Sequence, residues 1–293
     1  MPNTRDIRNR IRGVKNTQKI TRAMQMVAAS KMKRAQDRAL EGRPYARQLA
    51  RMLVSLIDKV GEVDFKHPFF EKRETRKRGV LIISTDRGLC GALNANLFRE
   101  AAAIPRKEVA FVSIGTKARQ FLSRTNRELL ADFSIAEEAP FKELRPVVEF
   151  LIEEYKKGTI DTIEVLFPRF KNTLVQEPVL FPYIPLVNLR QYVQEQAQAS
   201  GNELPEDERE LLFEPDPATI LNSLLDRFIK REFYQMLLDA RASEHSARMV
   251  AMKAATDNAK KLTDDLTLQY NKARQAGITQ EILEITAATL HQG

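Results

Sequence analysis

Cysteine and histidine are scarce in this sequence of 293 residues, which contains one cysteine and three histidines. A single thiol, Cys90, excludes an internal disulfide. The histidines, His67, His245 and His291, are scattered along the chain and do not form a cluster with metal-ligand spacing. Neither a disulfide framework nor a structural metal is therefore expected to hold this fold together.

Long apolar runs are also missing. No stretch approaches the roughly 18 consecutive apolar residues that identify a membrane-spanning helix. The chain starts MPNTRDIRNRIRG, without the apolar segment that secretion signals contain. We expect a soluble chain that is not exported and has no direct membrane insertion.

Positive charge is in excess and is concentrated at the amino terminus. The net charge is +8, and residues 1–60 alone contribute +11, with 15 Lys and Arg against 4 Asp and Glu. A basic helix of this kind usually has a polyanionic partner, which can be nucleic acid, a lipid surface or an acidic protein surface. A nucleic-acid role is favoured by aromatic residues that stack on bases, and none occurs before Tyr45.

The first 40 residues show the period of a coiled-coil helix. Apolar, small or polar residues that can face a second helix recur in alternating steps of four and three, which is the seam of a left-handed coiled coil. The seam consists of Ile7, Ile11, Val14, Gln18, Thr21, Gln25, Ala28, Met32, Ala35 and Ala39. Pro44 removes a helical hydrogen bond, so a kink or break is expected there before the helix resumes.

A second long helix is predicted at the other end of the chain. Asp216 can cap it and Pro217 can take its first position, and no Pro or Gly follows before Gly277, after which a separate capped segment is expected from Thr279. Its predicted seam is Ile229, Phe233, Met236, Ala240, Ser243, Ala247, Val250 and Ala254, then Ala255, Ala259, Leu262, Leu266, Gln269, Ala273 and Ala276, with Leu283, Ala287 and Leu290 beyond. Residues 1–58 and 217–293 are therefore predicted to pair as a long antiparallel coiled coil, a shaft.

The region between the two helices has an α/β pattern. Apolar runs at 79–84, 108–114 and 159–167 predict buried strands, and helices are predicted at 94–103, 116–123 and 143–156. This alternation indicates a Rossmann-like, mostly parallel sheet over residues 78–193, with one or two edge strands in the proline-bearing stretch 175–193. The chain has 43% hydrophobic residues, enough to bury such a core. Residues 194–216 are predicted to be an exposed acidic loop.

The loop 84–91, Ser-Thr-Asp-Arg-Gly-Leu-Cys-Gly, joins a predicted strand to a predicted helix, where α/β folds often bind phosphate. Its glycines match neither dinucleotide-binding nor P-loop spacing, so a structural or contact loop is the favoured interpretation. Cys90 has no histidine near it in sequence to act as a base, and a packing role is favoured over nucleophilic catalysis. No catalytic, cofactor-binding or metal-ligating residue is assigned, and no cofactor is expected.

With these elements placed, the sequence resembles the gamma subunits of F-type ATP synthases of the bacterial type, over essentially the whole chain. One block of the resemblance is GVKNTQKITRAM at 13–24, continued by MVAASKM at 26–32. Another is STDRGLCGALN at 84–94. The last is SEHSARMVAMKAATDNA at 243–259, extended by YNKARQ at 270–275 and ITQE at 278–281.

The resemblance implies a non-catalytic rotor subunit of the central stalk. Such a subunit transmits torque between the membrane c-ring and the catalytic ring of alpha and beta subunits, during proton-driven ATP synthesis or during ATP hydrolysis. The paired terminal helices turn inside that ring, and the α/β domain, the foot, binds the epsilon subunit and the c-ring. The implied location is peripheral, on the cytoplasmic face of the bacterial inner membrane. A basic coiled-coil nucleic-acid-binding protein is the alternative, and nucleotide turnover by the 84–91 loop is a third hypothesis.

The resemblance also implies contacts with the beta subunits. Met24, Arg248, Gln275 and Thr279 would meet loops of beta, and the loop around Arg87 and Cys90 would face its acidic lever segment. Exposed ion pairs contribute about 0 to 1 kcal/mol and exchange readily, whereas a large apolar patch would hold a rotor at one angle. One departure from the family is visible: the loop 194–210 is longer than in many bacterial members. The dithiol insert of chloroplast members is missing, since there is one cysteine, so thiol control is not expected.

Overall fold

A computed structural model describes residues 4–60, 67–70, 73–137, 140–186, 214 and 216–290, with side chains at 43, 47, 58–60 and 287–290 excepted. The chain divides into two compact units. We call Met1–Ser30 with Arg248–Gly293 the helix unit, and Lys31–Ala247 the sheet unit. The predicted acidic loop 194–216 lies outside the described residues except for Glu214 and Asp216.

The sheet unit contains five strands in the spatial order β3-β2-β1-β4-β5. The strands β1, β2, β3 and β4 run parallel to their neighbours, and β5 is antiparallel to β4. Their bounds are β1 Arg78–Ile83, β2 Val109–Ile114, β3 Leu129–Phe133, β4 Thr162–Phe170 and β5 Gln176–Ile184. The predicted mostly parallel α/β sheet is thereby confirmed.

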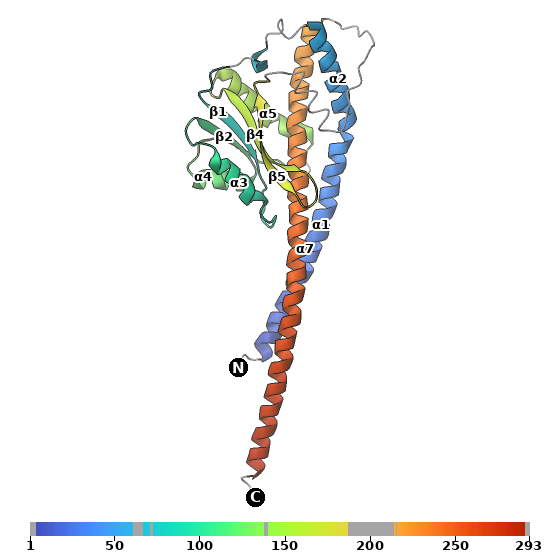
Figure 1. Cartoon of the computed structure of the whole chain (residues 1–293), viewed down its shortest axis with the longest axis vertical. Helices are drawn as coiled ribbons and strands as arrows, with labels where there is room; N and C mark the ends of the chain where they lie inside the picture. The colour runs from blue at the N-terminus through green and yellow to red at the C-terminus, as the bar shows by residue number, and fades with distance from the viewer. Residues whose placement is uncertain are drawn as a thin grey trace. The chain divides into compact units, whose positions relative to one another are not determined.

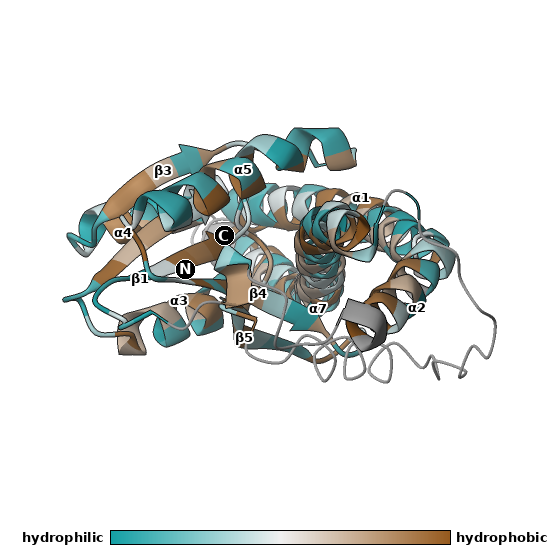
Figure 2. Ribbon diagram, turned by 90° about the horizontal axis from the view of Figure 1, so that it is seen from above, coloured by the Kyte–Doolittle hydropathy of each residue, from teal (hydrophilic) through white to brown (hydrophobic). Residues whose placement is uncertain are grey.

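Helices cover both faces of this sheet because its central strands are apolar on both sides (Figure 2). Residues of β1 that alternate along the strand point to opposite cores: Val80 and Ile82 pack with α3 and α4, whereas Leu81 and Ile83 pack with α5, α2 and α7. Figure 1 shows α3 and α4 on one side of the sheet and α5 on the other. The helical bounds are η1 Pro68–Phe70, α3 Leu93–Ala103, α4 Thr116–Arg124 and α5 Phe141–Lys157.

The two edge strands differ in how far the sequence predicted them. The prolines predicted an edge strand after residue 175, and β5 carries Pro178 and Pro182 at the edge of the sheet. The strand β3 was not predicted. It has five residues and is mostly half-buried, and among the described strands it pairs only with β2, so it lacks the continuous apolar run of a central strand.

The amino-terminal helix breaks where predicted. Helix α1 spans Thr4–Glu41 and α2 spans Arg43–Val60, so the break lies at Gly42, directly before the first turn of α2 that contains Pro44. Pro44 is tolerated there because the first amides of a helix have no intrahelical partner. In the sheet unit, α2 contributes Leu49, Leu53 and Leu56 to the core beneath α5.

The carboxyl-terminal helix α7, Pro217–Leu290, is longer than predicted because it has no interruption at Gly277. Its start matches the prediction, since the carboxylate of Asp216 accepts a 2.9 Å hydrogen bond from the backbone N–H of Thr219. These contacts also hold the pKa of Asp216 below its ordinary value. A glycine in a helix interior is about 1 kcal/mol less favourable than an alanine. This cost is small beside the hydrogen bonds of the rest of α7, so the helix continues through Gly277.

The helix unit is a pair of antiparallel helices, formed by residues 4–30 of α1 and residues 248–290 of α7. Thr21 contacts Thr256, and Arg8 donates to the hydroxyl of Tyr270. The residue numbers therefore increase along one helix while they decrease along the other, as in an antiparallel pair. Every predicted seam residue of α1 between Ile7 and Ala28 is buried or half-buried, which confirms that seam.

The predicted seam of α7 is wrong in part of this unit. Ala254, Leu262 and Gln269 are exposed, and Leu262 is 48% exposed. The side chains at the interface are instead Thr256, Thr263 and Tyr270. After Ala259 the next residue at the interface is four positions on, at Thr263, whereas the prediction placed it three positions on, at Leu262. The buried hydroxyl of Thr263 is tolerated because it donates a 2.9 Å hydrogen bond to the carbonyl of Ala259.

The Thr21–Thr256 contact gives a testable coupling. The two hydroxyl oxygens are 2.7 Å apart, and Thr256 also bonds to the carbonyl of Met252 at 2.8 Å. We expect Thr21→Val and Thr256→Val each to lower the free energy of unfolding by about 1 kcal/mol, because each leaves a hydroxyl with a lost partner. The double variant is expected to lose less than the sum. Chemical denaturation followed by circular dichroism measures this, and strictly additive losses would contradict it.

Candidate partner-contact surfaces

The loop 84–94 of the sheet unit is held in one conformation by side-chain hydrogen bonds. Asn94, in the first turn of α3, donates to the hydroxyl of Thr85 at 2.7 Å and to the sulfur of Cys90 at 3.3 Å. The Thr85 hydroxyl in turn donates to the carbonyl of Arg87 at 2.7 Å. Leu89 has a backbone φ of 63°, a value that non-glycine residues rarely adopt, so these bonds hold a tight turn in place.

Two side chains at the start of the same loop also cap the neighbouring helix α4. The carboxylate of Asp86 accepts from the backbone N–H of Thr116 at 3.0 Å, and the hydroxyl of Ser84 accepts from the backbone N–H of Ala118 at 2.8 Å. Both amides belong to the first turn of α4, so this helix start is capped by the protein's own side chains. The geometry agrees with a structural or contact loop.

Arg87 and Cys90, predicted together as contacts, differ in exposure. Arg87 and Gly88 are exposed, and Leu89 is 62% exposed, so these residues form the outward tip of the loop. Cys90 is only 2% exposed and packs beneath the tip. Sequence spacing alone does not separate the two, because the reversal at Leu89 decides which side chain points inward.

The helix unit has a basic face on α1. Among residues 4–30 there are seven exposed Lys and Arg and one acidic residue, Asp6. The basic residues are Arg5, Arg8, Arg10, Arg12, Lys15, Lys19 and Arg22. Residues 248–286 of α7 are nearly balanced in charge, so the excess predicted from the sequence lies on one helix of the pair.

The predicted contact residues of the helix unit fall in two places. Met24 and Arg248 are half-buried, whereas Gln275 and Thr279 are exposed. The hydroxyl of Thr279 donates to the carbonyl of Gln275 at 3.0 Å, which places these two one turn apart. Arg248 and Gln275 are separated by roughly 40 Å of helix at 1.5 Å per residue, so the residues form two contact points rather than one site.

Aliphatic side chains gather on the last described turns of α7. Ile278, Ile282, Leu283 and Ile285 are each about half exposed or more. The sequence predicted Leu283 to continue the coiled-coil seam, and it is 64% exposed instead. The register that pairs Arg8 with Tyr270 places the start of α1 before this point, so the described part of α1 does not cover these side chains. An exposed apolar cluster of this kind marks an interaction surface.

Other classes of site are not found in the part of the chain that the structure describes. No helix there is both long and apolar enough to cross a bilayer. Within the same residues, no three His, Cys, Asp or Glu side chains gather in a way that could ligate a metal ion.

Comparison with known proteins gives consistent matches. The chain matches the family described as "ATP synthase" over residues 3–289. It is 53% identical to the ATP synthase gamma chain of Opitutus terrae over 291 residues, which cover 98% of each chain, and 46% identical to that of Methylacidiphilum infernorum over the full length of both. Its fold is similar to a chain in the rotor of the mitochondrial ATP synthase of Euglena gracilis, with a TM-score of 0.64, 17% identity and coverage of 94% and 98% of the two chains.

Proposed function

Because the chain belongs to the family of ATP synthase gamma subunits, we propose that its helix unit turns inside a ring of alternating alpha and beta subunits while its sheet unit binds the epsilon subunit and the c-ring. Membership in this family makes the chain a non-catalytic rotor component of the central stalk of F-type ATP synthase, with a part in ATP synthesis and proton transport. The chain is therefore a peripheral part of that complex.

The basic face of α1 is the observation that carries the proposal. Seven exposed cations with one acidic neighbour favour a polyanionic partner, and in this proposal an acidic lining of the ring is that partner. Exposed ion pairs are individually weak and exchange quickly, so such a surface can turn without being held at one angle. The aliphatic end of α7 supports a second contact, in which an apolar collar of the ring covers Ile278 and its neighbours; because apolar contact is non-directional, a collar that surrounds the helix does not hold it at one angle.

The loop 84–94 would supply a third contact. Arg87 points outward from a tip fixed by hydrogen bonds, and an acidic segment of a beta subunit is its proposed partner. The thiol of Cys90 is buried, so it would act by holding the loop rather than by touching the ring. The bacterial relatives support a location on the cytoplasmic face of the inner membrane.

Stoichiometry tests the assembly directly. An affinity tag on this chain is expected to co-purify six larger nucleotide-binding chains for each copy, together with epsilon and c subunits. Native mass spectrometry measures the ratio. Recovery of the chain alone, or with nucleic acid in place of the ring, would reject the proposal.

Rotation tests the contacts on the helix unit. We expect Arg248→Leu and Gln275→Leu to slow ATP-driven rotation about tenfold, because burying a leucine against the ring at one angle stabilises that angle by roughly 1.5 kcal/mol or more. Single-molecule rotation at saturating ATP measures the stepping rate. Arg99→Leu, on the exposed face of α3, adds the same side chain to the sheet unit and serves as the control. Unchanged stepping in the two α7 variants would contradict the proposed contacts.

A further inference from the structure

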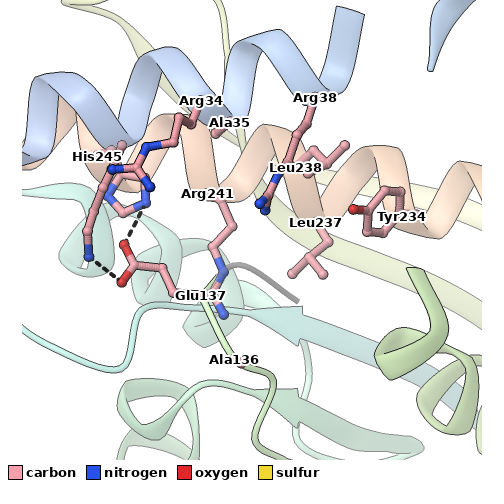
Figure 3. A pocket seen from close by; sticks show the side chains of 11 residues that line it. Arg34, Ala35, Arg38, Ala136, Glu137, Tyr234, Leu237, Leu238, Arg241 and His245 are labelled. Atoms are coloured by element: carbon pink, nitrogen blue, oxygen red, sulfur yellow. Dashed lines mark hydrogen bonds and ion pairs between the residues drawn. The ribbon is translucent and has the colours of Figure 1, made fainter. Parts of the chain in front are cut away.

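Glu137 lies in the segment between β3 and α5 and contacts two long helices at once (Figure 3). Its carboxylate is 2.6 Å from the ammonium of Lys31 on α1 and 3.0 Å from Nε2 of His245 on α7. Two residues earlier in the same segment, the carbonyl of Ile135 accepts a 2.9 Å hydrogen bond from the guanidinium of Arg241, also on α7. All of these residues belong to the sheet unit.

The contact is shielded from solvent on the α7 side. The side chains of His245 and Arg241 are 3% and 8% exposed, whereas those of Lys31 and Glu137 are about one third exposed. Ala35, Leu237 and Leu238 line an adjoining cavity of about 20 Å³, which has room for about one water molecule. The cavity is therefore too small for a metabolite, and the chemistry of this place lies in the protein's own ionic contacts.

Groups on both helices contact or flank the carboxylate. Lys31 on α1 and His245 on α7 contact it directly, and Arg34, Arg38 and Arg241 line the cavity beside it. Glu244 pairs with Arg241 at 3.2 Å. Burial disfavours the charged form of Glu137, but Lys31, His245 and Arg241 outweigh that effect and hold its pKa below the ordinary value. Because the pKa is lowered on folding, the contact is present at neutral pH and is lost as the pH falls through the lowered pKa.

We propose that Glu137 is a positioning residue for torque transfer, which fixes the angle of the sheet about the helices of its own unit. The inference rests on the rotor function proposed above. Apolar packing of the sheet on α2 and α7 is non-directional and resists separation more than sliding. An ionised acceptor bound to a donor on each helix is directional, so it resists rotation of the sheet about the helix axis.

The test compares two isosteric variants in the assembled complex. Glu137→Gln removes the charge while keeping the size of the side chain. The matched control is Glu128→Gln, which removes a 2.7 Å ion pair between Glu128 and Lys77. This pair has a similar exposure and joins two residues next to strands of the sheet, neither of them on α1 or α7. With the ring fixed to a surface and a bead on the sheet unit, the width of thermal angular fluctuations during a pause measures torsional stiffness.

We expect a broader angular distribution for Glu137→Gln and an unchanged one for Glu128→Gln, with both complexes still rotating. Amide hydrogen exchange in the segment 134–137 is expected to be about tenfold faster in Glu137→Gln only, because a charge-assisted contact to each helix is weakened. An equal width in both variants overturns the positioning role while leaving the rotor function intact. If Glu137→Gln does not assemble, Lys31→Gln, which removes one arm of the contact, is measured in the same way with the same two outcomes.

Discussion

Replacing Phe233 with alanine is expected to lower the free energy of unfolding by about 4 kcal/mol, because it leaves a cavity in the main core. Phe233 of α7 is fully buried, and its ring lies edge to face with that of Tyr183 on β5, at 4.4 Å between centroids. The hydroxyl of Tyr183 donates to the carbonyl of Ile229 at 2.7 Å, so the pair joins the helix to the edge strand. Urea denaturation of the isolated chain, followed by circular dichroism, measures the loss.

Two further variants separate the cavity from other effects. Phe233→Leu keeps much of the volume and is expected to cost about 1.5 kcal/mol. Phe141→Ala removes a ring that is 39% exposed and is expected to cost less than Phe233→Ala. A loss below roughly 2 kcal/mol for Phe233→Ala would mean that the sheet does not depend on this core for its attachment to α7.

Gly115→Ala is expected to cost about 3 kcal/mol, from backbone strain together with a steric clash. Gly115 connects β2 to α4 with a φ of 98°, and an added Cβ would lie 2.4 Å from the carbonyl oxygen of Ser84. Neither atom can move easily, because Ser84 follows the buried strand β1 and bonds to α4 through its hydroxyl. Chemical denaturation measures the loss.

Gly158 provides the matched control for this change. It follows α5 with a φ of 76°, and nothing lies within 4 Å of the position of an added Cβ. Gly158→Ala therefore reports the left-handed backbone alone and is expected to cost about 1 kcal/mol. Equal losses at the two glycines would show that the approach to Ser84 contributes nothing.

The sequence predicted the elements whose residues are buried along their whole length, and it failed to predict those whose residues are only half-buried. The central strands are apolar runs, and the break near Pro44 has a local steric cause, so both could be predicted without knowing the neighbours. The strand β3 could not, because half-buried residues such as Leu130 and Ala131 owe their conformation to pairing with β2. The interface contains Thr263 and not the predicted Leu262 because the register of α7 is set by its partner helix, which the sequence of α7 alone does not specify.

The candidate contact residues were predicted only through resemblance to a family. Their residue types carry no chemistry of their own, so spacing could not have selected Gln275 or Thr279. The structure adds that Cys90 is buried, which follows from the turn at Leu89. The contacts of Glu137 were missed because its partners, Lys31 and His245, lie more than a hundred residues away in sequence, on different helices.

The continuity of α7 through Gly277 has a mechanical consequence for the helix unit. Where α1 lies beside α7, two rods share any bending load, and the resistance of such a pair far exceeds that of one rod. Beyond the point where α1 starts at Thr4, α7 continues for about 16 residues, or roughly 24 Å. A sideways force on this end of α7 is therefore expected to bend the single helix slightly, while the part of α7 that is paired with α1 stays straight.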